Sequence, residues 1–155
     1  MTAAQLLDAL RARQLTIAVA EGDTGGVVLG LLTAVPGSSA VVLGGVVAYH
    51  DDLKQTLLGV PTELFVAHGS VSQQVAEAMA HGILRATGAR VGAAATGIAG
   101  PGGATASKPV GLTWLAVTDG QRTVSQQHHW QGDRAENRTA SAQALFDFAL
   151  EFVKA

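Results

Sequence analysis

Two glycine-rich segments each follow a short apolar run and carry polar side chains suited to ligand binding or hydrolysis. The first reads Ala-Glu-Gly-Asp-Thr-Gly-Gly over residues 20–26, and the second reads Thr-Gly-Ile-Ala-Gly-Pro-Gly-Gly over 96–103. A buried strand that ends in a glycine-rich turn before a helix is how α/β folds build ligand sites. We therefore expect both turns to meet over one pocket. Taken alone, the first segment is equally explained by a strained strand-to-helix turn, and the second by a flexible lid or a plain connection.

Two other segments carry charged side chains that could reach the same pocket. Residues 49–54 read Tyr-His-Asp-Asp-Leu-Lys, and Lys54 falls one turn into a predicted helix, where it either extends into solvent or points at the pocket. Arg134 and Arg138 follow Gly132-Asp133 and lie four residues apart on one helix face. They could clamp a phosphate together, or they could be ordinary surface arginines.

Several other kinds of site are not predicted. The chain has no cysteine, which excludes disulfides, thiolate metal sites and a cysteine nucleophile. His128 and His129 are adjacent on a predicted strand, so their side chains point to opposite faces and no metal is expected there. Neither phosphate-binding signature, G-x-x-x-x-G-K-[ST] or G-x-G-x-x-G, occurs.

The elements that must position these residues follow from hydrophobic periodicity and from turn residues. Helices are predicted after the first glycine-rich turn and over 3–13, 51–58, 72–87 and 133–153, and strands over 15–20, 41–49, 91–96, 110–118 and 122–130. Asp119-Gly120 is typical of a hairpin turn, and the weakly alternating last strand is typical of a sheet edge. Strands that alternate with helices and end in a hairpin predict an α/β fold: a single domain over 1–155, built as a three-layer α/β/α sandwich with a mixed β-sheet.

Composition narrows the class of protein. The 155 residues are 48% hydrophobic and 14% charged, and the formal net charge is −2. This balance excludes disorder and does not favour nucleic-acid binding. The N-terminus lacks a secretory pattern, and glycines within 25–49 argue against a membrane helix, so we expect a cytoplasmic protein with no membrane contact. Because few charges leave much apolar surface to cover, we also expect a homo-oligomer.

Taken together, the four segments resemble one known family, the C-terminal domain of competence/damage-inducible protein CinA, described as a nicotinamide-nucleotide amidase. The family typically reads A-E-S-C-T-G-G, V-P-G-S-S, G-G-V-V-x-Y-S-N-x-x-K, L-G-V, H-G-x-V-S, T-G-I-A-G-P-G-G, K-P-V-G-x-x-W and G-D-R-x-x-x-R. The matching positions here are Ala20-Glu21, Thr24-Gly25-Gly26, 35–39, 44–47, Tyr49, Lys54, 58–60, 68–69, 71–72, 96–103, 108–111, Trp114, and Gly132-Asp133-Arg134 with Arg138.

The resemblance implies a reaction, but this sequence differs from the family motif at the residue that is taken to be the nucleophile. Family members are taken to hydrolyse the carboxamide of nicotinamide mononucleotide to the acid and ammonia, with the serine of A-E-S-C-T-G-G as nucleophile and the lysine of Y-S-N-x-x-K as its base. Here the Ser-Cys pair is Gly22-Asp23, and Ser-Asn is His50-Asp51. We expect Lys54 to pair with Asp23, and a left-handed Gly22 would strain any serine placed there.

Three functional hypotheses follow from the sequence. The chain is an amidase that works by another route, with Thr24 as nucleophile or Asp23 activating water, assisted by Tyr49 and Lys54. Alternatively it is a non-catalytic member that binds a pyridine nucleotide or a partner protein, or it is a structural or regulatory subunit. The residues expected to bind a ligand are Gly25, Gly26, Thr96, Gly97, Gly100, Gly102, Arg134 and Arg138. No cofactor and no metal are expected.

Overall fold

One mixed five-stranded sheet forms the centre of the molecule. The computed structural model describes residues 2–155, and its strands lie in the order β2-β1-β3-β4-β5. The strands are β1 (Ile17–Glu21), β2 (Val42–Val47), β3 (Val91–Gly97), β4 (Leu112–Thr118) and β5 (Thr123–His129). The pairs β1–β2 and β1–β3 are parallel, whereas β3–β4 and β4–β5 are antiparallel. The predicted terminal hairpin is confirmed, with β5 at the sheet edge as expected.

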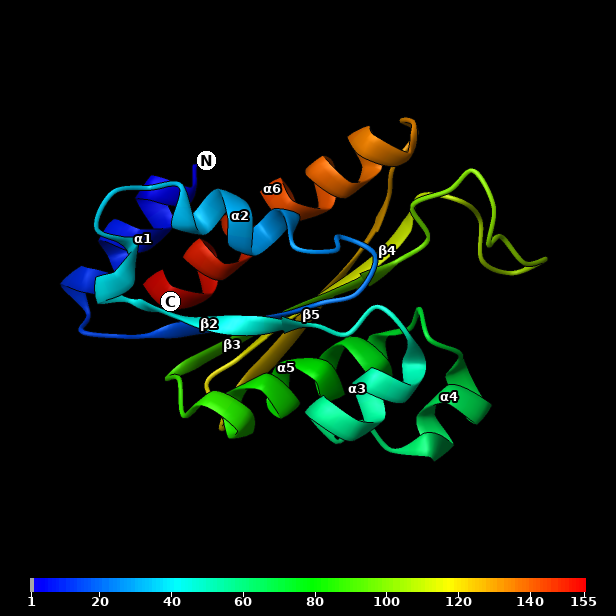
Figure 1. The fold of residues 1–155 in the computed structure, drawn as a ribbon, viewed down its shortest axis with the longest axis horizontal. Helices are drawn as coiled ribbons and strands as arrows, with labels where there is room; N and C mark the ends of the chain where they lie inside the picture. Colours follow the sequence, from blue (N-terminus) through cyan, green and yellow to red (C-terminus); the bar gives the residue numbers. More distant parts are fainter. Residues whose placement is uncertain (1) are drawn as a thin grey trace.

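Helices cover both faces of this sheet. One layer holds α1 (Ala3–Ala12), α2 (Val27–Thr33) and α6 (Arg134–Lys154), and the other holds α3 (Asp51–Leu58), α4 (Thr62–His68) and α5 (Gln73–Thr87), as Figure 1 shows. A short 3-10 turn, Ser38–Ala40, precedes β2. The three-layer α/β/α sandwich with a mixed sheet is therefore confirmed. The helix α4 was not predicted, because it buries none of its residues and so leaves no apolar stripe in the sequence.

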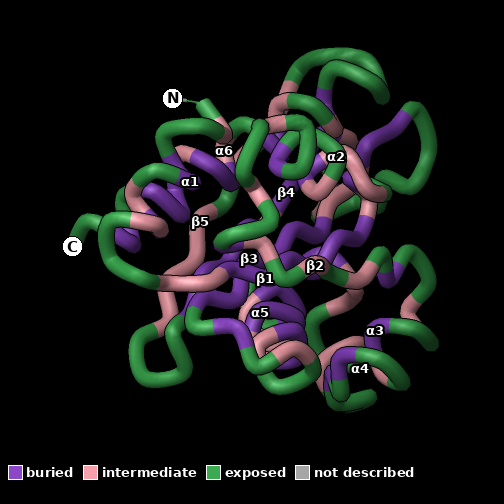
Figure 2. Tube along the Cα trace, turned by 60° about the vertical axis from the view of Figure 1, so that its left-hand side comes forward, coloured by how far each residue is buried: buried purple, intermediate pink, exposed green. Residues whose placement is uncertain are grey.

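The core divides into two clusters, one on each face of the sheet. The larger cluster joins α1 and α6 to the sheet through side chains such as Leu7, Leu145 and Phe146. The smaller cluster packs α5 against the opposite face, with Met79 and Ile83 fully buried. The buried segments in Figure 2 follow the central strands and the inner faces of these helices. Both glycine-rich turns therefore extend from a rigid, doubly covered sheet.

The order of the strands creates a crevice between β1 and β3. The chain leaves β1 through α2 to pair β2 on one side, and it then returns through α3, α4 and α5 to pair β3 on the other side. Connections that depart in opposite directions leave a crevice at the carboxyl ends of the two strands, where α/β proteins bind ligands. Figure 1 shows the start of α6 and the long loop after β3 reaching the same end of the sheet.

Local signals explain where the long helices begin and end. Asp133 caps α6, accepting a hydrogen bond from the Glu136 amide in a full capping box, as expected from the sequence. Ser72 caps α5 by accepting a hydrogen bond from the Val75 amide, and Gly88 ends α5 in a left-handed conformation. These caps place the first turn of α6 and the loop before α5 beside the crevice.

The outer surface bears on the expected homo-oligomer and on the expected lack of membrane contact. Exposed large apolar side chains lie on α2, β2, α3, α4 and the loop after β2, namely Leu31, Leu43, Val47, Tyr49, Leu53, Leu57 and Val66. They agree with the reasoning behind a homo-oligomer, which stays a prediction. Within residues 2–155, no helix combines the length and apolar character needed to cross a membrane.

Candidate functional site

A hollow of about 280 Å³ lies at the carboxyl ends of β1 and β3. Its walls come from the turn after β1, the start of α3, the segment before α5, the turn after β3 and the first turn of α6. The lining residues are Asp23, Tyr49, Asp51, Lys54, Ser70, Val71, Thr96, Gly97, Ile98, Ala99, Gly100, Gly102, Gly103 and Arg134. The expected convergence of the two glycine-rich turns with the N-terminus of helix 51–58 is thus observed.

The buried carboxylate of Glu21 shapes the first turn. Its Oε2 accepts hydrogen bonds from the amides of Gly26 (2.9 Å) and Val28 (3.1 Å), and its Oε1 accepts one from Leu29 at 2.9 Å. A carboxylate bonded to three amides at a helix N-terminus is favourable because it satisfies donors that lack an intrahelical partner. Glu21 therefore holds the turn against α2 and is not among the residues that line the hollow.

Arg138 secures the same turn from α6. Its Nε donates to the Asp23 carbonyl at 3.1 Å and its Nη2 to the Thr24 carbonyl at 3.0 Å. Neither Arg138 nor the adjacent Gly25 and Gly26 line the hollow. Arg138 and Arg134 thus face different partners, and the structure does not bring them together as the phosphate clamp considered above.

Gly22 occupies the position of the family nucleophile with an ordinary backbone. Its φ is not among the positive glycine φ angles, so the left-handed conformation considered above is wrong. A Cβ built there would lie 3.1 Å from the Ala95 carbonyl oxygen, a close approach that needs a small shift. Thr24, the alternative nucleophile, is fully buried and is not among the residues that line the hollow. Its Oγ1 has no hydrogen-bond partner in the described part of the chain.

Asp23 carries an unusual carboxylate in the wall of the hollow. Its Oδ1 is inaccessible to water and accepts no hydrogen bond from any of residues 2–155. Burial raises the pKa of Asp23 from 3.8 to about 6, against the lowering effects of its own backbone amide and of Lys54, Arg138 and Arg134. Gly97 leaves the room for this side chain, because a Cβ at Gly97 would lie 2.7 Å from Asp23 Oδ2.

Lys54 lies buried in the hollow and pairs with a different carboxylate from the one expected. Its side chain is 5% exposed, and its Nζ donates to Asp51 Oδ1 at 2.9 Å. The prediction that Lys54 forms an ion pair with Asp23 is therefore wrong. Asp51 lies one turn earlier on the same helix, a spacing that brings the two side chains together. Asp23 interacts with Lys54 only through its longer-range charge.

The sequence marked Asp51 as a departure from the family motif without giving it a role, and it did not single out Ser70 as a site residue. The Ser70 hydroxyl donates to Asp51 Oδ2, so the Asp51 carboxylate joins Ser70 to Lys54. Burial acts to raise the pKa of Asp51, but the hydrogen bonds from Lys54 and Ser70 outweigh it and leave that pKa below its ordinary value. The departure at Asp51 was the available signal in the sequence, whereas Ser70 carried none because its nearness depends on the packing of α3 beside α5.

Arg134 spans the mouth of the hollow. Its Nη1 donates to the Gly100 carbonyl at 2.8 Å and its Nη2 donates to the Tyr49 hydroxyl at 2.6 Å. Tyr49 itself is 58% exposed, so the hydroxyl is held at the rim. Asn137, which the sequence did not single out, holds the same turn from below by donating to the Ala99 carbonyl at 3.0 Å.

Thr96 connects the two sides of the hollow. It is buried, and its Oγ1 donates to the Ser70 carbonyl at 2.9 Å. Gly100 and Gly103 in the following turn adopt positive φ angles of 87° and 89°, which glycine tolerates and other residues rarely adopt. The hollow is therefore lined by the glycines of this turn together with Ile98 and Ala99.

The described residues, 2–155, contain no cluster of three or more His, Asp or Glu side chains able to hold a metal ion. His128 stacks on Trp130 with ring centroids 4.7 Å apart, and His129 Nε2 lies 3.1 Å from the Val110 carbonyl. The two histidines thus have separate neighbours, in line with their opposite directions on the strand.

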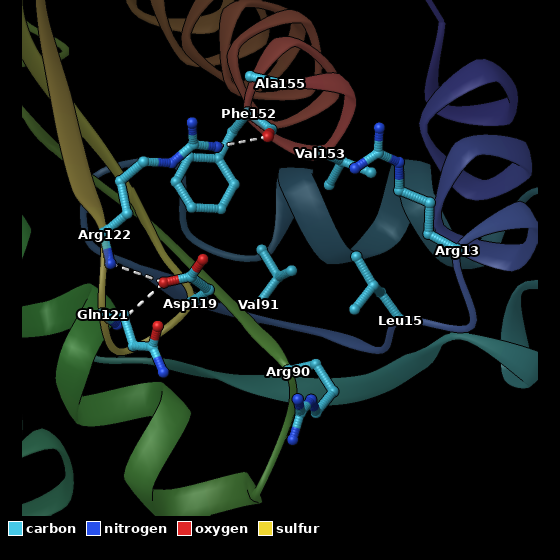
Figure 3. Close-up of a pocket in the computed structure, with 10 residues that line it drawn as sticks. All are labelled: Arg13, Leu15, Arg90, Val91, Asp119, Gln121, Arg122, Phe152, Val153 and Ala155. Carbon is cyan, nitrogen blue, oxygen red and sulfur yellow. Dashed lines mark hydrogen bonds between the residues drawn. The ribbon is translucent and has the colours of Figure 1, made fainter.

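A second hollow, of about 380 Å³, lies at the opposite end of the sheet, beside the end of α6. Figure 3 shows apolar side chains in its floor and three arginines around it. Arg13 donates to the Lys154 carbonyl at 2.9 Å, and Arg122 donates to the Phe152 carbonyl at 2.7 Å while its guanidinium lies 4.1 Å from the centre of the Phe152 ring. Arg13 and Arg122 therefore bind the C-terminus of α6.

Fold and site together define an α/β protein with a polar hollow at the topological switch point of its sheet. The family model for the CinA C-terminal domain matches residues 1–153. The chain belongs to the CinA C-terminal domain family.

Curated relatives support the same assignment. A CinA-like protein of Gemmatimonas aurantiaca is 46% identical over 145 residues, covering 94% of this chain and 34% of that protein. A CinA-like protein of Chlorobium phaeovibrioides is 46% identical over 155 residues, covering 96% of this chain and 36% of that protein. The chain thus spans about a third of the length of the curated relatives it matches.

Solved structures match the whole fold. The competence/damage inducible protein CihA of Agrobacterium tumefaciens is 38% identical with a TM-score of 0.94, covering 99% of this chain and 93% of that one. A CinA superfamily protein of Klebsiella pneumoniae is 28% identical with a TM-score of 0.95, covering 98% and 95%. Both of these proteins are named for competence and damage, and neither name states a substrate.

Proposed function

We propose that this chain binds a pyridine mononucleotide in the hollow at the carboxyl ends of β1 and β3, and that it has lost the amide hydrolysis of its family. The observation that supports the proposal is that neither the nucleophile position nor the lysine of the family motif is available for the reaction. Gly22 offers no nucleophile, and the Lys54 ammonium is held by Asp51 at 2.9 Å. A general base needs a nitrogen lone pair, and a lysine engaged as an ammonium by a carboxylate lacks one.

The other hydroxyls do not restore this chemistry. Thr24 Oγ1 lies outside the hollow. The Ser70 hydroxyl is in the hollow, but the group that accepts its hydrogen bond is Asp51, whose lowered pKa makes it a weak base. The hollow nevertheless keeps its glycine-rich wall and Arg134, which suit a phosphate or another anionic group. Binding therefore survives in this proposal while catalysis does not.

Binding is tested by thermal unfolding of the protein with and without nicotinamide mononucleotide. Ligand at about 100 times its dissociation constant stabilises a folded protein by about 2.7 kcal/mol, which is a rise of several degrees at this size. Arg134→Ala should lose most of that rise. Arg90→Ala, which changes an exposed arginine of the opposite hollow, should keep it. A parent protein with no ligand-induced rise would contradict the proposal and favour a structural or regulatory subunit.

A second candidate function is amide hydrolysis by water, and the Asp23 carboxylate favours it. A carboxyl group with a pKa of about 6 is suited to act as a general base near neutral pH. Ammonia release from nicotinamide mononucleotide by the parent at pH 7–8, abolished by Asp23→Asn, would establish this candidate and overturn the loss of catalysis. We expect no release above background.

A further inference from the structure

Asp23 is the one charged side chain of the hollow that has a buried oxygen without a hydrogen bond. Lys54 and Asp51 satisfy each other, Arg134 bonds to Tyr49 and Gly100, and Asp23 Oδ1 accepts nothing within residues 2–155. Buried polar atoms are almost always paired in native proteins, because an unpaired one forfeits its interactions with water. A ligand donor would satisfy this acceptor once the carboxylate turns toward the hollow that Asp23 lines.

We propose that Asp23 makes the hollow selective for the amide form of its ligand over the corresponding acid. This inference rests on the proposed binding of a pyridine mononucleotide. A carboxamide head group carries N–H donors that an Asp carboxylate can accept, whereas a carboxylate head group offers only acceptors. Two carboxylates facing each other in a largely buried site repel, and neither gains the hydrogen bond it lost from water.

The geometry of the hollow supports a ligand with two different ends. Asp23 comes from the turn after β1 and lies against Gly97, at the carboxyl ends of the two parallel strands, where it is partly buried. Arg134 and Tyr49 lie at the mouth, on α6 and after β2. The acceptor is therefore at the bottom and the cationic group at the rim, which suits a donor-bearing head inside and an anionic tail outside.

The charges around Asp23 do not cancel this selectivity. Lys54 faces it from α3, and Arg134 and Arg138 face it from α6, all lowering its pKa. Lys54 is paired with Asp51, and Arg138 is bonded to two backbone carbonyls. Because these cations already bond to other groups, they do not supply the hydrogen bond that the buried oxygen of Asp23 lacks. Asp23 is ionised above about pH 6.

The test compares two probes by calorimetry: nicotinamide mononucleotide and nicotinic acid mononucleotide. At pH 7.5 we expect the parent to bind the acid at least ~10-fold more weakly than the amide, a ratio equal to about 1.4 kcal/mol. In Asp23→Asn, whose side chain both donates and accepts, the ratio should fall to within about 3-fold. Asp119→Asn makes the same chemical change in the opposite hollow and should keep the parent ratio.

A pH series on the parent provides a second measurement that needs no variant. At pH 5 the Asp23 carboxyl is mostly protonated and can donate, so the ratio of the two dissociation constants should shrink. Protonation of the ligand phosphate affects both probes alike and cancels in the ratio. The pH dependence therefore decides the matter even if Asp23→Asn does not fold.

The outcomes separate this inference from the proposed function. Equal binding of the two probes by the parent, tighter binding of the acid, or a ratio unchanged in Asp23→Asn would overturn the role of Asp23 and leave nucleotide binding intact. Binding of neither probe would overturn the proposed function and, with it, this inference. Selective binding of the amide that is lost in Asp23→Asn would support both.

Discussion

The two hollows at opposite ends of the sheet differ in how their polar groups are satisfied. At the α6 end, Arg13 and Arg122 each bond a backbone carbonyl, and Asp119 Oδ1 accepts the amides of Gln121 and Arg122 at 2.9 and 2.7 Å. At the carboxyl ends of β1 and β3, Asp23 Oδ1 is buried without a partner and Lys54 is an almost fully buried charge. We therefore interpret the hollow with the larger volume as structural and propose the smaller one as the functional site.

The comparison teaches that the volume of a hollow is a poor guide to a functional site. Buried charges and buried polar atoms without a hydrogen bond are a better guide. Burying a charge or an orphan acceptor costs stability, so a fold retains such groups where a ligand or a reaction compensates. Capping a helix C-terminus with arginines is favourable in itself and needs no ligand. Three experiments test this difference.

The largest effect is expected from rebuilding the reacting positions. We expect the parent and Gly22→Ser/Asp23→Cys to release no ammonia from nicotinamide mononucleotide, because Asp51 still holds Lys54 as an ammonium. Adding Asp51→Asn frees that nitrogen, and the triple variant should gain turnover of several orders of magnitude, since helper groups act only together with their nucleophile. The assay follows ammonia at pH 7–8.

Two controls make that prediction specific. Lys54→Ala in the triple variant should return the rate to background, whereas Arg90→Ala in the triple variant should leave it unchanged. A double variant as fast as the triple would show that the Asp51–Lys54 pair does not suppress catalysis. The ordinary backbone at Gly22 spares a serine the left-handed strain, which leaves the 3.1 Å approach of its Cβ to the Ala95 carbonyl oxygen to be relieved by a small shift.

A smaller effect is expected from the pH dependence of stability. Because the Asp23 pKa is raised from 3.8 to about 6 by folding, the folded state binds the proton more tightly, and the parent loses stability as pH rises from about 4 to 6. The loss is at most about 3 kcal/mol, the equivalent of about two pKa units. Asp23→Asn should remove this slope and be more stable than the parent at pH 7.5, with little difference at pH 4.

Chemical denaturation at a series of pH values measures this difference. Asp119→Asn is the matched control, because the Asp119 pKa is lowered by its hydrogen bonds from the turn backbone and so favours folding in the ionised form. An Asp23→Asn variant that is less stable than the parent at pH 7.5 would show that the carboxylate is satisfied in solution, and the contrast between the hollows would weaken.

The smallest effect is expected at the α6 end. Arg122→Ala removes a 2.7 Å hydrogen bond to the Phe152 carbonyl and a contact with the Phe152 ring, so we expect a loss of about 1–2 kcal/mol. Ligand-induced stabilisation should stay unchanged, because this hollow binds nothing in our interpretation. Thermal unfolding with and without nicotinamide mononucleotide measures both quantities, and a lost ligand response would mark this hollow as functional.

Local sequence was sufficient for most of the architecture. Apolar stripes and caps located α1, α5 and α6, and the turn at Asp119-Gly120 located the hairpin, because each signal depends on residues near in the chain. The two glycine-rich segments located the carboxyl-edge site in the same way. The short helix α4 was not predicted, because it has no fully buried residue and no periodic apolar pattern.

The arrangement of charges within the site depended on the tertiary structure. The sequence alone determined that the family nucleophile is replaced by Gly22 and that Lys54 is retained. It could not determine whether Lys54 would pair with Asp23 or with Asp51. Asp23 lies in the turn after β1, and its distance from Lys54 depends on how α3 packs on the sheet. Only the folded chain paired Lys54 with Asp51, engaged Arg138 in holding a turn, and left Asp23 with a buried oxygen that has no partner.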